Sequence, residues 1–431
     1  MAVMWRTNAF GSQVFLAGQS VSLLGDGLAI LAIPLLVLHV TGSPVAAALA
    51  SAPRTIGYLL VGLPSGPIVD RVNPWRLLIA MDMLRAAVFI ALYIVTVAGT
   101  QSVPLILALA FVSGGAGVFF DSALTIAVRD VFAGAALLRA NSFLEMSTQT
   151  SVVLGPAVVG ASAAGFGINV ALLIDAATFM VSLATLFTVS RGQRRDEPAS
   201  AANSTSWRQL WPEFKAGFGY LLRARVILSL TIVQTVINLC LAVEKLIVFF
   251  AKDTLGLSAA LVSMAVVGGG MGGVIGALTA RRIVARVGAL RLVALSVALI
   301  GAALAAVSAA TDVWWLAAGN LALVWATIVA SIVIRTLRQE IVPRHLLGRV
   351  TSTVRTIYLA VTPIGAVLAG VFTSSLGNNP RPVFLGAGIL ILLTVALAWA
   401  TSLRRVQHAA TVTSPSASSG STGTSDADTH R

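Results

Sequence analysis

Residues 382–403 read PVFLGAGILILLTVALAWATSL, an apolar stretch without a charged residue. The hydrocarbon core of a bilayer is about 30 Å thick, so a helix that crosses it needs about 20 such residues. Similar stretches recur along almost the whole chain upstream of this one. We expect an all-α membrane protein with twelve spanning helices, over 13–38, 45–69, 76–98, 103–126, 140–164, 168–190, 226–250, 259–281, 289–310, 313–335, 350–374 and 382–403.

The composition also indicates a membrane protein. Hydrophobic residues make up 57% of the chain and charged residues only 10%, against about 25% charged in a soluble domain. A net charge of +13 would suggest a nucleic-acid partner in a soluble protein. Here we interpret the excess of basic residues as a topology signal and predict no nucleic acid.

The chain shows no pattern typical of a metal site or a cofactor. Cys240 is the single cysteine, and the four histidines are scattered without ligand spacing. The phosphate-binding pattern GxxxxGK[ST] is absent, which argues against ATP as the energy source. We predict neither a metal nor a cofactor, and no enzymatic activity.

Basic residues collect in every second gap between the expected spans. Loops rich in Lys and Arg stay on the cytoplasmic side, so this asymmetry predicts a multi-pass protein of the cell membrane with both termini in the cytoplasm. The opposite gaps hold only Lys252 and Arg381. The basic gaps and ends hold Arg6, Arg71, Arg76, Arg129, Arg139, Arg191, Arg194, Arg195, Arg208, Lys215, Arg223, Arg225, Arg281, Arg282, Arg286, Arg338, Arg344, Arg349, Arg404 and Arg405.

The longest gap divides the chain into two sets of six helices. We expect an N-terminal bundle over 1–190, a cytoplasmic linker over 191–225 and a C-terminal bundle over 226–405. Within the linker, apolar residues at helical spacing predict an amphipathic helix over 207–222 in the inner interface, and a partner-binding helix is the alternative. The Ser- and Thr-rich residues 406–431 predict a disordered tail.

The two halves show related features at similar places. Gly155 and Pro156 lie in the fifth span, and Pro363 and Gly365 lie in the eleventh. Two parallel halves related by an axis along the membrane normal are typical of transporters, whose substrate site lies between the halves near the bilayer midplane.

Charged and polar residues inside the spans mark candidate sites. A charge at a helix centre costs at least ~2.5–3.5 kcal/mol, so it normally faces a cavity or a partner. Asp26, deep in the first span between two glycines, is the first candidate for proton or substrate coupling, although a helix-packing role stays open. Asp121, Glu145 and Asp175 follow. Polar stripes add the cavity candidates Gln19, Ser22, Gln234, Asn238, Lys245, Asn320 and Tyr358.

Two motifs resemble those of the major facilitator superfamily. Residues 66–71, Gly66-Pro67-Ile68-Val69-Asp70-Arg71, with Arg76 following, resemble its loop motif, which latches one conformation. The resemblance implies that Gly66, Asp70, Arg71 and Arg76 form such a latch. In the matching loop of the second half, Ala280 stands where Asp is expected, so the second latch should be weak or absent.

The fifth span is similar to the antiporter motif of the family. Gly155, Pro156 and Gly160 match it, while Val159 replaces a second glycine. Further short matches, such as Leu24-Gly25-Asp26 and Asp82-Met83-Leu84-Arg85, point to the drug:proton antiporter branch that includes macrolide and enterobactin-type siderophore exporters.

This resemblance implies two pseudo-symmetric six-helix bundles and a secondary active transporter. We expect proton-coupled efflux of amphipathic small molecules, such as drugs, antibiotics or siderophore-like compounds, by alternating access in a monomer. An importer of a small polar solute on the same fold is the first alternative. A membrane enzyme or receptor that transports nothing is the remote one.

Overall fold

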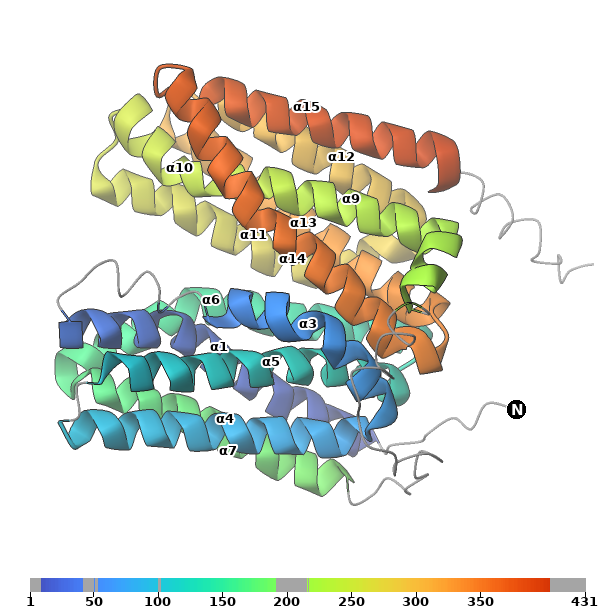
Figure 1. Ribbon diagram of the computed structural model, residues 1–431. Coiled ribbons are helices and arrows are strands. Elements are labelled where there is room, and N and C mark those ends of the chain that lie inside the picture. The colour runs from blue at the N-terminus through green and yellow to red at the C-terminus, as the bar shows by residue number, and fades with distance from the viewer. Residues whose placement is uncertain are drawn as a thin grey trace, which may run out of the picture.

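The computed structural model describes residues 9–41, 50, 53–99, 102–190, 215 and 217–403, and within these residues the regular structure is entirely helical (Figure 1). The first half contains α1 (Ala9–Thr41), α3 (Pro53–Arg71), α4 (Pro74–Val97), α5 (Val103–Val131), α6 (Gly134–Gly165) and α7 (Ile168–Ser190). The second half contains α9 (Arg225–Leu241), α10 (Leu246–Phe249), α11 (Ala259–Val287), α12 (Ala289–Ser308), α13 (Val313–Ile341), α14 (Arg344–Ser375) and α15 (Arg381–Ala398).

The described helices have the length and composition of membrane spans. Nine of them are long and apolar enough to cross a bilayer. This confirms the predicted multi-pass membrane protein and its all-α fold class.

Several helices extend five or six residues beyond the predicted spans at the end that carries the basic loops. α5 continues to Val131, α6 already begins at Gly134, and α14 already begins at Arg344. These extensions pack against the opposite half of the molecule, so apolarity toward lipid is not what defines their length.

Local chemistry explains where two of the helices start. The side chain of Asn73 accepts hydrogen bonds from the backbone N–H groups of Trp75 and Arg76, and Pro74 occupies the first position of α4. Asp312 caps α13 in the same way.

The seventh span differs from the prediction of one helix over 226–250. α9 ends at Leu241, a 3₁₀ segment follows over Ala242–Lys245, and α10 leads into a π-helical turn over Phe250–Thr254. This break could not be predicted from the sequence, because residues 225–254 contain neither proline nor glycine. Such a break often marks a hinge.

The two halves meet through a few helices (Figure 1). α3 packs against α14, α6 packs against α11 and α13, and α5 packs against α14. A buried apolar cluster crosses the interface at the basic end, where Val69 and Trp75 of the first half join Val342, Leu347 and Val350 of the second. This end of the interface is closed.

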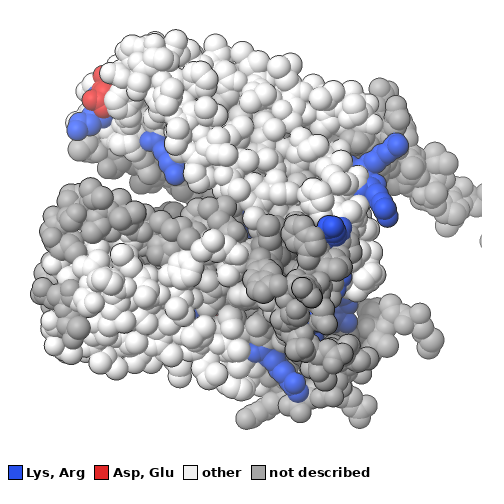
Figure 2. Space-filling model, in the orientation of Figure 1, with Lys and Arg blue, Asp and Glu red and all other residues white. Residues whose placement is uncertain are grey.

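At the other end the halves are apart. Buried positions on α14 are dense from Leu347 to Thr356 and then thin out to Gly365, Ala369 and Thr373. In Figure 2 most of the Lys and Arg side chains that can be seen lie toward the right of the view, at the closed end. The structure is therefore closed at the predicted cytoplasmic end and open at the opposite end.

Part of the predicted interfacial helix is described. Residue 215 and residues 217–223 are helical, with Leu221 buried and Phe218 and Leu222 exposed. Residues 207–214 and the predicted tail over 406–431 lie outside the described residues, so these predictions and the exact domain boundaries stay predictions.

Gly66 allows the closest approach of α3 and α14. A Cβ at this position would overlap the Ser352 hydroxyl and lie 2.7 Å from the Cα of Arg349. We therefore expect Gly66→Val to prevent closure, whereas Gly370→Val on α14, where a Cβ meets nothing within 4 Å, should not. The readout is cross-linking of Asp130→Cys to Arg344→Cys with a short bifunctional thiol reagent in a Cys240→Ser background. Equal cross-linking in both valine variants would contradict this role of Gly66.

Candidate functional site

Arg85 lies at the centre of the first half, with a side chain that is 1% exposed. Its Nη1 lies 3.1 Å from Oδ1 of Asp26 on α1, and its Nη2 donates to Asp82, one turn earlier on α4. The same Nη2 lies 3.4 Å from the hydroxyl of Ser22. One guanidinium group therefore serves two carboxylates from two helices.

Aromatic rings and a polar relay complete the surroundings of Arg85. Its guanidinium carbon lies 4.0 Å from the ring centroid of Phe120 and 4.4 Å from that of Phe179, both cation–π distances. Ser182 donates to the second oxygen of Asp82 at 2.6 Å, and the side-chain amide of Gln19 donates to Ser182 at 3.1 Å.

Gln19 and Ser22 were predicted to line a cavity, and the structure instead buries both inside the first half. Between α1, α4 and α7, the Gln19 amide donates a hydrogen bond to Ser182 and the Ser22 hydroxyl accepts one from Arg85. The helical stripe was recognised correctly, but it faces the interior of the bundle.

Asp175 on α7 belongs to the same cluster. Its side chain is fully buried, and neither carboxyl oxygen has a hydrogen-bond donor within the described residues. Thr178 donates to the backbone carbonyl of Asp175 at 2.7 Å. A Cβ on Gly25, the neighbour of Asp26, would overlap the Asp175 carboxyl group, so this glycine brings α1 against it. The cluster thus holds three carboxyl groups and one guanidinium group.

Several ion pairs of the described residues join the halves, and two of them involve the candidates Glu145 and Asp121. Oε2 of Glu145 on α6 lies 2.9 Å from Nη2 of Arg335 on α13. Oδ2 of Asp121 on α5 lies 2.9 Å from Nη2 of Arg355 on α14. Gln149 holds the other oxygen of Glu145 at 3.0 Å. In both pairs the first half supplies the acid and the second half supplies the base.

A polar layer lies beside these pairs. The side-chain amide of Asn141 donates to the hydroxyl of Thr336 at 2.9 Å and to Oε1 of Gln339 at 2.6 Å. Arg129 donates to the backbone carbonyl of Val342 at 2.6 Å. These bonds also cross from one half to the other.

The loop motif makes its own contact across the interface. Asp70 accepts hydrogen bonds from the backbone N–H groups of Gly348 at 2.9 Å and Arg349 at 3.1 Å, and Nε of Arg349 lies 3.3 Å from the same carboxylate. An acid near the start of α14 also interacts favourably with the helix dipole. Arg71 is half-buried at the end of α3, and Arg76 is exposed at the start of α4.

The corresponding loop of the second half is different. Ala280 is fully buried in the apolar core of that half, and Arg281 and Arg282 are exposed. Within the described residues, no ion pair connects either arginine to the first half.

In the second half, Gln234 on α9 contacts Arg338, which we expected in a basic gap and which the structure instead buries within α13. Nη2 of Arg338, on α13, donates to Oε1 of Gln234 at 2.6 Å, and the side chain of Arg338 is 6% exposed. Tyr358 on α14 is half-buried close to the same group. The spacing of Arg335 and Arg338, which places both on one face of α13, could have revealed this residue.

Three other cavity candidates lie elsewhere. Asn238 donates to the backbone carbonyl of Gln234 in its own helix. Asn320 is buried and donates to the backbone carbonyl of Ala265 on α11 at 3.0 Å. Lys245 is exposed at the break in the seventh span.

The antiporter-like motif is only partly a packing element. A Cβ on Gly155 would lie 2.5 Å from the backbone oxygen of Gly27, so α6 and α1 approach closely there. A Cβ on Gly160 would meet nothing within 4 Å. α6 continues through Pro156 to Gly165.

Comparison with known proteins settles the family. The model of the Major Facilitator Superfamily matches residues 15–251 and 245–422, which together cover nearly the whole chain. The chain belongs to the Major Facilitator Superfamily. Its fold was therefore predicted correctly from the motifs in the second-to-third loop and the fifth span.

Relatives and structures agree with this assignment. The multidrug efflux pump Tap of Mycolicibacterium fortuitum is 25% identical over 389 residues, which cover 86% of this chain and 91% of the relative. Tap of Mycobacterium tuberculosis is 26% identical over 388 residues, covering 86% and 88%. The crystal structure of a bacterial homologue of the iron transporter ferroportin, in an outward-facing state, has a TM-score of 0.73 at 17% identity and covers 90% of this chain and 99% of its own.

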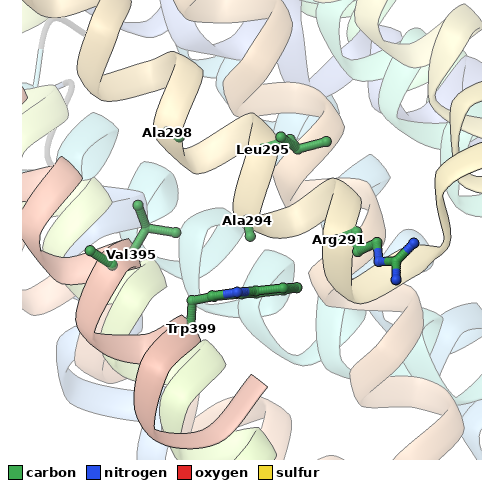
Figure 3. A pocket seen from close by; sticks show the side chains of 7 residues that line it. Arg291, Ala294, Leu295, Ala298, Val395 and Trp399 are labelled. Carbon is green, nitrogen blue, oxygen red and sulfur yellow. The ribbon is translucent and has the colours of Figure 1, made fainter. Parts of the chain in front are cut away.

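A separate groove on this superfamily member holds none of the candidate residues. It has a volume of about 410 Å³ and lies between α12 and α15, where Leu295, Val395 and the flat indole of Trp399 surround it and Arg291 stands at one side (Figure 3). Its lining is almost entirely apolar. The charged candidate residues lie elsewhere, inside the first half and between the two halves.

Arg85 should be essential for the stability of the fold as well as for holding Asp26 and Asp82 in place. Removing one partner of a buried ion pair leaves an uncompensated charge and typically costs about 3–5 kcal/mol. We expect Arg85→Ala to lower the unfolding temperature of the purified protein in detergent, and Arg85→Ala with Asp82→Asn to recover part of the loss. Arg139→Ala, at an exposed position, is the control. An unchanged unfolding temperature in Arg85→Ala would contradict the central role of this guanidinium.

Proposed function

We propose that the chain is a secondary exporter that moves amphipathic small molecules out of the cell in exchange for protons. The observation that carries this proposal is the asymmetric interface, closed by paired charges at the basic end and open at the other. The multidrug efflux pumps among its relatives favour export over import. We further propose that one chain is sufficient, because both walls of the pathway come from the same molecule.

The proposed cycle alternates between two arrangements of the halves. In the present one, Asp70, Glu145 and Asp121 hold the second half at the basic end. Opening that end breaks all three contacts and exposes both walls to the cytoplasm. Because these ion pairs are only partly buried, with Arg335 39% and Arg355 28% exposed, the net gain from each is small, and the closed arrangement can be exchanged for another without a large change in free energy.

The Arg85 cluster is the proposed site of proton exchange. Three carboxyl groups share one guanidinium group in an apolar environment, where unpaired charges are costly. We propose that the cluster holds an exchangeable proton, and that Asp175, which has no donor within the described residues, carries it. Asp26, in contact with Arg85 and 16% exposed, is the proposed route between Asp175 and the space between the halves.

Proton coupling can be tested with everted membrane vesicles and norfloxacin, a fluorescent amphipathic compound. We expect an acidic interior to accelerate uptake by the wild-type protein. Asp175→Asn mimics a permanently protonated acid, so its uptake should no longer respond to the pH gradient, and Asp26→Asn should weaken the response.

Asp312→Asn is the matched control, because asparagine caps a helix as well as aspartate does and Asp312 is exposed at the start of α13. Full gradient-driven uptake by Asp175→Asn would remove Asp175 from the coupling mechanism. The absence of gradient-driven uptake by the wild type would contradict proton-coupled export of this compound.

The proposed orientation places both termini and the closed end in the cytoplasm. In a Cys240→Ser background, Arg282→Cys should be labelled by an impermeant thiol reagent only in everted vesicles, whereas Asn379→Cys should be labelled on intact cells. Both positions are exposed. The reverse pattern would invert the topology and make the present structure inward-facing.

A further inference from the structure

Arg338 is a buried cation without a carboxylate partner in the described part of the chain. Its side chain is 6% exposed, and its Nη2 donates a hydrogen bond to the neutral amide oxygen of Gln234 at 2.6 Å. The charged groups that act on it most strongly are two more cations, Arg335 and Arg355, together with the ionisable hydroxyl of Tyr358. A guanidinium group in such a place normally has a carboxylate or phosphate beside it.

The three arginines form one basic wall on the second half. Arg335 and Arg338 are one turn apart on α13, and Arg355 of α14 is close enough to Arg338 to act on it electrostatically. Arg335 pairs with Glu145 and Arg355 pairs with Asp121, but both acids belong to the first half. In the closed arrangement, the ion pairs of the described residues thus join Arg335 and Arg355 to one carboxylate each across the interface, and they include none for Arg338.

Opening the basic end changes this balance further. When the halves separate there, Glu145 and Asp121 move away with the first half, while all three arginines remain on the second. The second half then presents three guanidinium groups, with the hydroxyl of Tyr358 nearby, to the cytoplasm. Guanidinium groups bind carboxylates with two parallel hydrogen bonds.

We propose that Arg335, Arg338 and Arg355 form the binding site for a carboxylate group on the exported solute. This inference rests on the proposed function, and it narrows the substrate class to amphipathic anions and zwitterions. In the inward-open arrangement the carboxylate of the solute takes the place of the two absent acids, with Arg338 as its permanent partner. When the basic end closes, Glu145 and Asp121 pair with Arg335 and Arg355 again. The affinity for the solute then falls, and the solute leaves toward the open end.

Arg338 could instead be a simple structural tie between α13 and α9 through Gln234. Arg338→Gln separates the two roles, because glutamine keeps an N–H donor group but lacks the positive charge, although it is also shorter and loses the fork of donors. Arg338→Lys retains the charge and loses the fork-shaped donor arrangement. Arg291→Gln, at an exposed arginine in the groove between α12 and α15, is the matched control.

The test uses purified full-length protein and a matched pair of probes, norfloxacin and its methyl ester. Both carry the same ring system and amine, and they differ in the carboxylate. We expect the wild type to bind the acid at least about tenfold more tightly than the ester in equilibrium dialysis, the weight of one charge-assisted hydrogen bond. Arg338→Gln should abolish this preference by weakening the acid alone, Arg338→Lys should retain part of it, and Arg291→Gln should retain all of it.

Two results would overturn the inference. If the wild type binds acid and ester equally, no carboxylate site exists. If Arg338→Gln weakens both probes to the same extent, Arg338 is structural. Vesicle transport distinguishes this failure from failure of the proposed function, because gradient-driven uptake of both probes at equal rates contradicts the carboxylate site alone, whereas no gradient-driven uptake of either contradicts proton-coupled export.

Discussion

Carboxylates of the first half meet guanidinium and backbone N–H groups of the second half at one end of the molecule, and the arrangement of the whole protein depends on this contact. Asp70 binds the start of α14, Asp121 pairs with Arg355, and Glu145 pairs with Arg335. The apolar cluster around Val69 and Leu347 closes behind them. Because these contacts lie at one end only, the other ends of the helices are free to separate.

The chemistry of this closure suits a protein whose halves must separate better than it would suit a rigid scaffold. Apolar packing alone would hold the halves firmly, whereas partly buried ion pairs gain little net free energy, because attraction is offset by desolvation. Water or a charged solute can replace each partner when the halves separate. The same reasoning connects the two proposed sites, since the Arg85 cluster has more acids than bases and the basic wall around Arg338 has more bases than acids.

The sequence predicts the fold well because its strongest signals are local. A stretch such as 382–403 identifies a spanning helix by composition, and the order Gly66 to Arg71 identifies a motif by its spacing. Helical spacing also grouped Gln19 with Ser22 and Asp26 correctly. It could not tell that Gln19 and Ser22 face Ser182 and Arg85 within the bundle, because spacing shows which residues share a face and not which helix covers that face.

Long-range pairs and backbone irregularities were beyond the same reasoning. Glu145 and Arg335 are 190 positions apart, and nothing in either segment indicates its partner. The helix break over Ala242–Lys245 contains no proline or glycine, the residues from which such a break is usually predicted. Only the structure shows that Arg338 has no carboxylate partner among the described residues, although its spacing from Arg335 already placed both on one face of α13.

Reciprocal movement of the two ends is the most direct test of this account. Spin labels at Arg139→Cys and Arg286→Cys span the closed end, and labels at Phe166→Cys and Leu376→Cys span the open end, all at exposed positions. In a Cys240→Ser background, double electron–electron resonance should show the distance at the closed end lengthening and the distance at the open end shortening when the pH is changed or norfloxacin is added. Two distances that stay fixed, or that change in the same direction, would contradict an interface that opens at one end as it closes at the other.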